Sequence, residues 1–294
     1  MTRKSDFQIA LHYDGSFVRG HTITARTLGH SLVALQQMVD KAVMYEKRGS
    51  IKKYDVLPAV WYKLADLEVQ PFEDGCIKIP LIGLDKTQVI SLLKGLLYEP
   101  FQQAISDNPI SEKSLVSGLS AAINRAAHKI DVLTHQQILD NSGAIEKRYF
   151  AEAIFRDFDK LIFSLRSSFI TDKELISIEL SDEMGSREYE FNRHSSRKFH
   201  KIVSAKQLGP TIEFSGRLTV FGEANSKYFP YFGKFFSKAS NQEHKLLIHE
   251  EADIDTLRGY NTSHNDLNFL GAPVTAWGAF DELRGDIVFL KLNG

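Results

Sequence analysis

The fold is decided by residues 211–250, TIEFSGRLTVFGEANSKYFPYFGKFFSKASNQEHKLLIHE. Short runs of apolar and aromatic residues alternate there with polar turns, a pattern that predicts strands. From this stretch to its end the chain predicts strands at 211–221, 231–236 and 244–250, a helix at 254–259, and strands at 274–280 and 286–292. Three strands, a helix and two strands is the order of a small OB-type Greek-key barrel. We therefore expect an OB-like β domain over residues 207–294.

The start of the chain predicts a strand and then a long helix. Residues 7–13 are mostly apolar and end at Asp14-Gly15, a dipeptide typical of tight turns. Apolar residues then recur at helical spacing between positions 28 and 43. Thr24 is placed to cap the start of this helix and Gly49 to end it.

A hairpin and three further helices are predicted next. Residues 64–72 and 76–81 alternate apolar and polar side chains, which predicts paired strands. Helical spacing recurs at 88–105, 114–133 and 145–168. The first of these helices is apolar on more than one side, so we expect it to be deeply buried or part of an interface. The chain is thus assigned to the α+β class, with an α+β module and a helical middle forming one domain over residues 1–170.

Composition excludes several classes of protein. The 294 residues are 43% hydrophobic and 25% charged, as in ordinary globular proteins, and the net charge of −1 provides no global attraction to nucleic acid or to an anionic membrane. Cys76 is the lone cysteine, and neither a signal peptide nor an apolar run of membrane-spanning length is present. We therefore expect a cytoplasmic protein with no membrane partner.

Residues 171–206 are predicted to form a basic β-hairpin that links the two domains. The apolar period changes to two near Ile176, which predicts strands. Within residues 186–206, six cationic side chains oppose two acidic ones, which gives a local charge of +4. The candidates for binding a partner or nucleic acid in this region are Arg187, Arg193, Arg197, Lys198 and Lys201.

Aromatic residues crowd the second strand of the predicted barrel and the turn before it. Rings stack on bases while interleaved lysines neutralise phosphates, and OB-type barrels commonly present this chemistry on their second and third strands. The candidate binding residues here are Lys227, Tyr228, Tyr231, Phe232 and Lys234. Strand alternation sends only about half of the rings outward, and the others fill the barrel core.

The N-terminal region also carries a resemblance. Tyr13-Asp14-Gly15, His21 and residues 28–32 (LGHSL) resemble a family of uncharacterised bacterial and prophage proteins that pair an α+β module with a small C-terminal β domain. The resemblance covers both ends of the chain and leaves the helical middle unmatched. It implies no particular activity. It implies a setting among mobile elements and their conflicts with hosts, such as phage or bacterial defence and counter-defence.

The sequence contains none of the common local signatures of catalysis, such as a P-loop, a nucleophile elbow or a zinc-binding cysteine pair. His128, Asp131 and His135 share one side of a predicted helix and could bind a metal, although solvated surface residues are the stronger interpretation. Asp157 and Asp159 resemble nuclease carboxylates but fall on a helix, which favours a charged outer face. We predict no catalytic residue, no metal and no cofactor.

These observations leave three hypotheses. The first is a non-catalytic interaction protein that binds a protein partner or assembles with copies of itself. The second is a protein that binds single-stranded nucleic acid through residues 187–206 and the aromatic strand 228–236. The third is an enzyme with a dispersed metal site, for which the sequence gives the least support.

Overall fold

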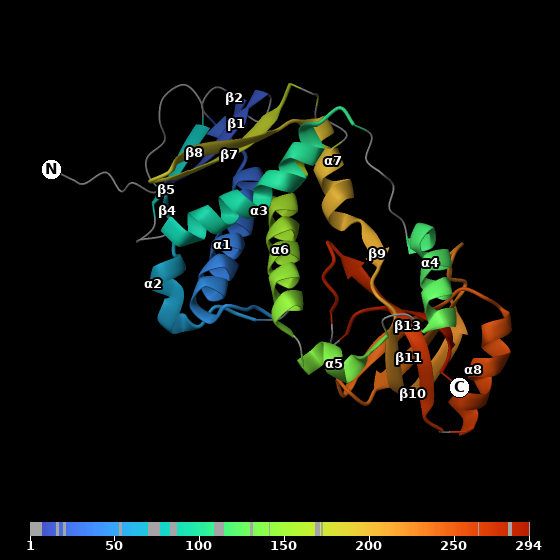
Figure 1. Ribbon diagram of the computed structural model, residues 1–294. Helices are drawn as coiled ribbons and strands as arrows, with labels where there is room; N and C mark the ends of the chain where they lie inside the picture. The colour runs from blue at the N-terminus through green and yellow to red at the C-terminus, as the bar shows by residue number, and fades with distance from the viewer. Residues whose placement is uncertain are drawn as a thin grey trace. The chain divides into compact units, whose positions relative to one another are not determined.

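The computed structural model divides the chain into two compact units (Figure 1). Unit 1 comprises residues 1–111 and 150–204, and unit 2 comprises residues 112–149 and 205–294. Within these ranges the structure describes residues 8–15, 18–19, 22–52, 55–69, 77–82, 87–108, 115–129, 132–140, 142–167, 171, 173–263, 265–281 and 284–293. Each unit is built around its own sheet.

The sheet of unit 1 has five antiparallel strands in the order β4-β5-β1-β7-β8. Their bounds are β1 Gln8–Asp14, β4 Glu68–Val69, β5 Ile77–Ile82, β7 Leu175–Asp182 and β8 Gly185–Phe191. A separate pair, β2 Val18–Arg19 and β3 Thr22–Ile23, lies near the start of the chain. The hairpin predicted at 64–81 is present as β4 and β5, and its predicted turn at residues 73–75 lies outside the described residues.

Four helices lie on one side of this sheet in Figure 1. They are α1 Ala25–Arg48, α3 Thr87–Ile105, α6 Ser142–Leu161 and α7 Arg193–Ser204. Three short helices follow α1 and α6 in the chain: η2 Ala59–Trp61 and α2 Tyr62–Ala65 after α1, and η3 Phe163–Arg166 after α6. The predicted caps of α1 are confirmed, because Thr24 Oγ1 accepts a hydrogen bond from the Thr27 amide at 3.2 Å and Gly49 has a φ of 72°.

The apolar excess of α3 is used inside unit 1. Val89, Ile90, Leu93 and Leu97 are all buried, and the helix packs against α1, α7 and β7. The sequence left open whether this helix is deeply buried or part of an interface, and the structure shows that its buried side lies in the core of unit 1.

Unit 2 contains a closed five-stranded β-barrel. Its strands are β10 Ile212–Glu223, β11 Tyr231–Ser237, β12 Gln242–Ile248, β13 Leu267–Ala276 and β14 Ile287–Leu292. They follow the order β10-β11-β12-β14-β13, and the additional pairing of β13 with β10 closes the barrel. The β12–β14 pair is parallel and the other four pairs are antiparallel. The short strands β6 Leu133–Thr134 and β9 Lys206–Leu208 extend the sheet at β10 and β13.

Helices cover parts of the barrel. The interior is filled by large side chains such as Phe214, Phe235 and Phe269, and the glycine at 216 makes room for one of them, since a Cβ there would lie 2.8 Å from the ring of Phe235. The helix α4 Leu115–His128 packs on the outer side of β13 and β14. The helices α5 His135–Asp140 and α8 Ala252–Ser263 each bury one apolar side chain in the inner cluster.

The compact units differ from the predicted domain boundaries in two places. Residues 175–181 of β7 pair with β1, so β7 and β8 complete the sheet of unit 1 rather than linking two domains. The rest of the predicted β-hairpin is not strand, because residues 193–204 form the amphipathic helix α7. Residues 112–149, predicted as part of the first domain, belong to unit 2 because α4 buries its apolar side on the barrel. In addition, the strand predicted at 274–280 is β13, which begins earlier, at Leu267.

Candidate binding face of the β-barrel

The outer side of β11 carries aromatic and cationic side chains in alternation. Because successive side chains of a strand point to opposite sides, Gly233, Phe235 and Ser237 are buried inside, whereas Phe232, Lys234 and Phe236 point outward. Phe236 is 39% exposed, Phe232 is half-buried and Lys234 is exposed. Strand β11 therefore presents two rings with a lysine between them.

Neighbouring strands extend this surface into rows. Phe236 lies opposite Arg217 of β10 and Glu243 of β12, and Lys234 lies opposite Val220 and Lys245. All four neighbours are exposed. The glycine at position 222 lies opposite Phe232 and leaves space for its ring, since a Cβ at this glycine would meet the ring at 3.2 Å. We call residues Arg217, Val220, Phe232, Lys234, Phe236 and Lys245 the barrel face.

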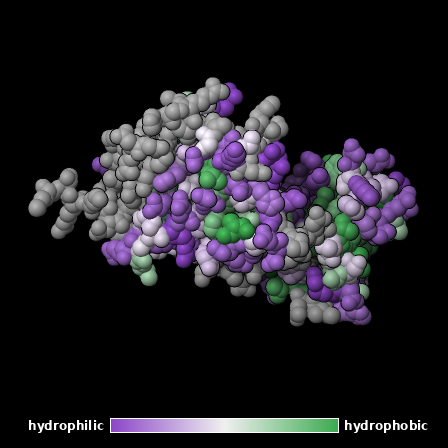
Figure 2. Space-filling view, turned by 90° about the horizontal axis from the view of Figure 1, so that it is seen from above, coloured by the Kyte–Doolittle hydropathy of each residue, from purple (hydrophilic) through white to green (hydrophobic). Residues whose placement is uncertain are grey.

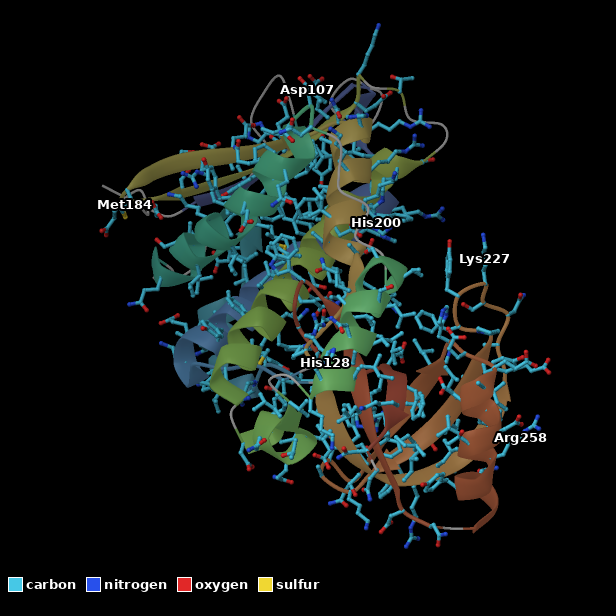
Figure 3. The ribbon with its side chains drawn as sticks, turned by 45° about the vertical axis from the view of Figure 1, so that its right-hand side comes forward. Asp107, His128, Met184, His200, Lys227 and Arg258 are labelled. Carbon is cyan, nitrogen blue, oxygen red and sulfur yellow. The ribbon has the colours of Figure 1, made fainter. Side chains whose placement is uncertain are left out.

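Lysines lie over two of the aromatic rings. Lys245 Nζ is 5.5 Å from the centroid of the Phe232 ring, and Lys227 Nζ is 5.6 Å from that of Tyr228. Tyr228, 47% exposed, and Lys227 belong to the segment between β10 and β11, from which Lys227 points away from the barrel (Figure 3). Such contacts place a cation and an aromatic ring side by side on the same surface.

Acidic side chains neutralise part of the positive charge. Lys234 Nζ is 2.9 Å from Glu243, while Arg217 and Lys238 both pair with Asp266. The hydrogen bond from Lys238 lowers the pKa of the Asp266 carboxyl. Lys227 and Lys245 have no acidic partner within ion-pair distance among the described residues, so these two carry the unopposed charge near the rings.

Tyr231, predicted to contribute to an outer binding surface, lies on the inward side of its strand. Its side chain is half-buried and packs against the inner core of the barrel. Position 231 has the same parity as Phe235, which also points inward. Phe229, another ring of the same run, is buried in the cluster that α4 covers.

The predicted basic residues of the other candidate region lie in unit 1. Arg187 is exposed on β8 and its guanidinium lies 4.6 Å from the ring centroid of Tyr98. The other four candidates lie on α7, which carries no acidic residue, and they are Arg193, Arg197, Lys198 and Lys201. Arg197 and Lys201 are exposed one helical turn apart, whereas Lys198 donates a hydrogen bond to the Ser106 carbonyl. The positive charge predicted for a linker is therefore mostly the outer side of a packed helix.

The histidines considered as metal ligands do not come together. His128 is exposed at the end of α4 (Figure 3), whereas His135 is buried with its Nδ1 at 2.9 Å from Ser237 Oγ. Asp131 lies outside the described residues. His244 is fully buried and bonded to Ser240 and Gly285, and among the residues that the structure describes no group of three or more potential ligands could hold a metal ion.

The acidic residues of α6 form ion pairs. Asp157, predicted to lie on a charged outer face, is instead fully buried and binds Lys41 and Lys160. Asp159 pairs with Arg166 and, at 2.9 Å, with Nδ1 of His200. Each carboxylate is thus engaged by two basic groups from other parts of unit 1 or from the same helix.

Sequence analysis missed the part of the barrel face that lies on neighbouring strands. Arg217 and Lys245 were not singled out, because nothing in the local sequence says which residues of β10 and β12 lie opposite Phe236 and Lys234. Within β11, the alternation of side chains is the one sequence signal that distinguishes the outward Phe232 from the inward Tyr231, because Tyr231 is an even number of residues from the buried Phe235. The residues of the face on β10 and β12 could be identified only from the register of these strands with β11.

The chain was compared with protein-family models, curated proteins and solved structures, and no match was found in any of the three. The resemblance to bacterial and prophage proteins stays a prediction. In the described part of the chain, the helices are too short or too polar to cross a membrane. Figure 2 shows that hydrophilic residues dominate the described surface seen from above, with hydrophobic residues in small patches.

Proposed function

We propose that this chain is a non-catalytic binding protein whose barrel face holds single-stranded nucleic acid. The observation that carries the proposal is the alternation of Phe232, Lys234 and Phe236 on the outer side of β11, with Lys245 lying over the first ring. Rings stack on bases of any sequence and cations neutralise the phosphates between them. We also propose that the exposed cations of α7, in unit 1, contact phosphates in the same sequence-independent way.

We further propose that the barrel is of the OB type. In support, its strands follow the order first-second-third-fifth-fourth, and α8 connects the third strand to the fourth. In OB-type barrels the second and third strands commonly form the binding surface. Those strands are β11 and β12 here, which carry Phe232, Phe236 and Lys245. The cytoplasmic location, the lack of catalysis and the setting in phage or bacterial defence stay predictions.

The test is fluorescence anisotropy with a labelled oligothymidylate, a single strand that forms no duplex. We expect binding that weakens steeply with salt and that Phe232→Ala reduces about 5- to 100-fold. Tyr62→Ala is the matched control, because Tyr62 is 49% exposed in unit 1, far in sequence from the barrel face. Binding that is absent, independent of salt or equally strong in Phe232→Ala would refute the proposal.

A second candidate function is association with a protein partner or a second copy of the chain. It is favoured by Phe236 and Val220, apolar side chains that are 39% and 41% exposed on adjacent strands. Protein interfaces are enriched in such exposed aromatic side chains flanked by charged groups. Light scattering after size exclusion tests self-association: a dimer that Phe236→Asp dissociates supports this function, and a monomer at all concentrations argues against a second copy as the partner.

A further inference from the structure

Unit 1 contains a cavity that the proposed function does not use. It has a volume of about 580 Å³, within the range of small-molecule sites. One wall is a stripe of α1 that includes His30, Val33 and Gln37, and the other wall is formed by Lys160 and Phe163, where α6 meets η3. Val33 and Phe163 are 59% and 60% exposed, so two large apolar side chains face solvent around this cavity.

The ring of Phe163 is held in place by its neighbours. The Arg166 guanidinium carbon lies 5.1 Å from the ring centroid, and Arg166 is itself fixed by an ion pair with Asp159. Two hydrogen bonds anchor the backbone just before Phe163: Ser31 donates to the Leu161 carbonyl and Ser196 donates to the Ile162 carbonyl, both at 3.2 Å. An exposed ring in a fixed position is a platform on which a planar ligand can stack.

The cavity also carries a positive charge. Lys160 Nζ lies 2.8 Å from Oδ1 of Asp157, and Lys41 binds the other oxygen of the same buried carboxylate. Two ammonium groups that share one carboxylate leave one positive charge in excess. None of the described residues that line the cavity is acidic, while Gln37 and His30 offer further hydrogen-bonding groups. A ligand with an anionic group and a flat apolar body would match these features.

We infer that the cavity between α1 and the α6–η3 corner binds a small planar anion, an aromatic or heteroaromatic ring that carries a phosphate or a carboxylate. The ring stacks on Phe163 and contacts Val33, and the anionic group binds Lys160. This site lies wholly within unit 1 and does not depend on the barrel face.

Isothermal titration calorimetry tests the inference with four probes: adenosine monophosphate, 2-naphthoate, adenosine and inorganic phosphate. We expect at least one of the first two to bind, and adenosine and phosphate to bind at least about tenfold more weakly, because each lacks one half of the recognised chemistry. Failure of both anions to bind, or equal binding of adenosine, overturns the inference.

Two variants that place opposite charges at position 33 test whether the anion binds in this cavity. Val33→Glu brings a negative charge to the cavity and should weaken binding about tenfold or more, whereas Val33→Lys, with a side chain of similar length, should retain or strengthen it. Both variants should fold, because Val33 is largely exposed on a helix. Val60→Glu, at an 83% exposed position of η2, is the control and should bind normally. Equal affinities of Val33→Glu and Val33→Lys would show that the anion binds elsewhere.

Discussion

The Nδ1 atom of His244 lies 2.9 Å from the carbonyl oxygen of Gly285, in the wall of the barrel. Because a carbonyl can only accept, Nδ1 carries the proton and donates it. Nε2 of the neutral ring is then an acceptor for the hydroxyl of Ser240 at 3.0 Å. The ring is fully buried, and burial lowers the pKa of His244 below its usual value near 6.5.

The first prediction is that the barrel loses stability in mild acid. In the unfolded chain His244 gains a proton as the pH falls through about 6.5, whereas the folded barrel keeps the ring neutral. The free energy of unfolding should therefore decrease below pH 6.5, with a slope of up to about 1.4 kcal/mol per pH unit from this group. Urea denaturation at pH 7.5, 6.5 and 5.5 measures this free energy. The fluorescence of Trp277 in a Trp61→Phe background is the signal, so that only unit 2 is observed.

The variant His244→Asn isolates this contribution. The asparagine amide can replace Nδ1–H as donor to Gly285 but does not titrate. We expect it to cost about 1–2 kcal/mol at pH 7.5 and to show a shallower loss of stability in acid. An unchanged pH slope in the variant would assign the acid sensitivity to other groups.

The second prediction concerns the carboxylate of Asp182 at the end of β7. Burial raises its pKa, but hydrogen bonds from Lys94 at 2.7 Å and Ser91 at 3.0 Å outweigh that effect, and the pKa is lowered overall. The stability that this carboxylate provides is therefore present above its unfolded pKa and lost as the pH falls through the folded value. We expect Lys94→Met to destabilise unit 1 by about 1–3 kcal/mol at pH 7, because it leaves a buried carboxylate without its cation.

Urea denaturation at pH 7 and pH 3, followed by Trp61 in a Trp277→Phe background, checks this expectation. The difference between Lys94→Met and the parent chain should shrink at pH 3, because without the cation burial raises the pKa of Asp182 and the carboxylate of the variant is neutralised before that of the parent chain. Lys63→Met, at an exposed lysine of α2, is the control and should change stability by less than about 0.5 kcal/mol. A penalty of equal size at both pH values would mean that poorer packing, not the missing charge, causes the effect.

The third prediction concerns close packing in the barrel. At Gly216 a Cβ would lie 2.0 Å from the carbonyl oxygen of Phe236, which is backbone and has little freedom to move. We expect Gly216→Ala to destabilise unit 2 by about 1–3 kcal/mol or more. At Gly259, in α8, a Cβ would meet no atom within 4 Å, and Gly259→Ala should be neutral or stabilising by up to about 1 kcal/mol. Thermal unfolding compares the melting temperatures of both variants with that of the parent chain. A Gly216→Ala variant as stable as the parent chain would contradict the described strand register.

The fourth prediction separates two adjacent rings of β11. Phe232→Ala should weaken oligonucleotide binding with little change in melting temperature, since Phe232 points outward. Tyr231→Ala should lower the melting temperature of unit 2, since Tyr231 packs on the inner core. Binding measured on the folded fraction should be nearly normal for Tyr231→Ala. The reverse result would mean that the outward and inward sides of the strand are exchanged.

The fifth prediction concerns the salt dependence of binding. Removing two exposed charges of α7 with Arg197→Gln and Lys201→Gln should reduce the slope of log affinity against log salt by about 0.7 for each phosphate that is no longer neutralised. Anisotropy titrations between 50 and about 200 mM salt give the slope. The control is the double variant Lys63→Gln and Lys173→Gln, which removes two exposed lysines outside α7 and should leave the salt slope unchanged. Equal slopes in both double variants would show that α7 makes no phosphate contacts.

Local sequence was sufficient for most of the individual elements, but not for α7, which lies in the segment predicted to be a β-hairpin. The caps of α1 at Thr24 and Gly49 depend on hydrogen bonds and backbone angles within a few residues, so the sequence shows them directly. The order of strands and helix in residues 211–292 likewise follows from hydrophobic period and turn residues, although β13 begins earlier than predicted. Part of the candidate site could also be predicted, because aromatic and cationic residues are concentrated in one short segment of the sequence. These residues are Lys227, Tyr228, Phe232 and Lys234.

Only the tertiary structure decided which of these elements belong together. The pairing of β7 with β1 joins residues more than 160 positions apart, and the packing of α4 on the barrel depends on apolar surfaces that any helix of similar pattern could provide. The barrel face needed the register of three strands, because a shift by one residue would exchange Phe232 for Tyr231 and bury the lysines. Hydrophobic period thus determined most of the helices and strands of this chain, while long-range pairing and register determined its two units and the residues that face solvent.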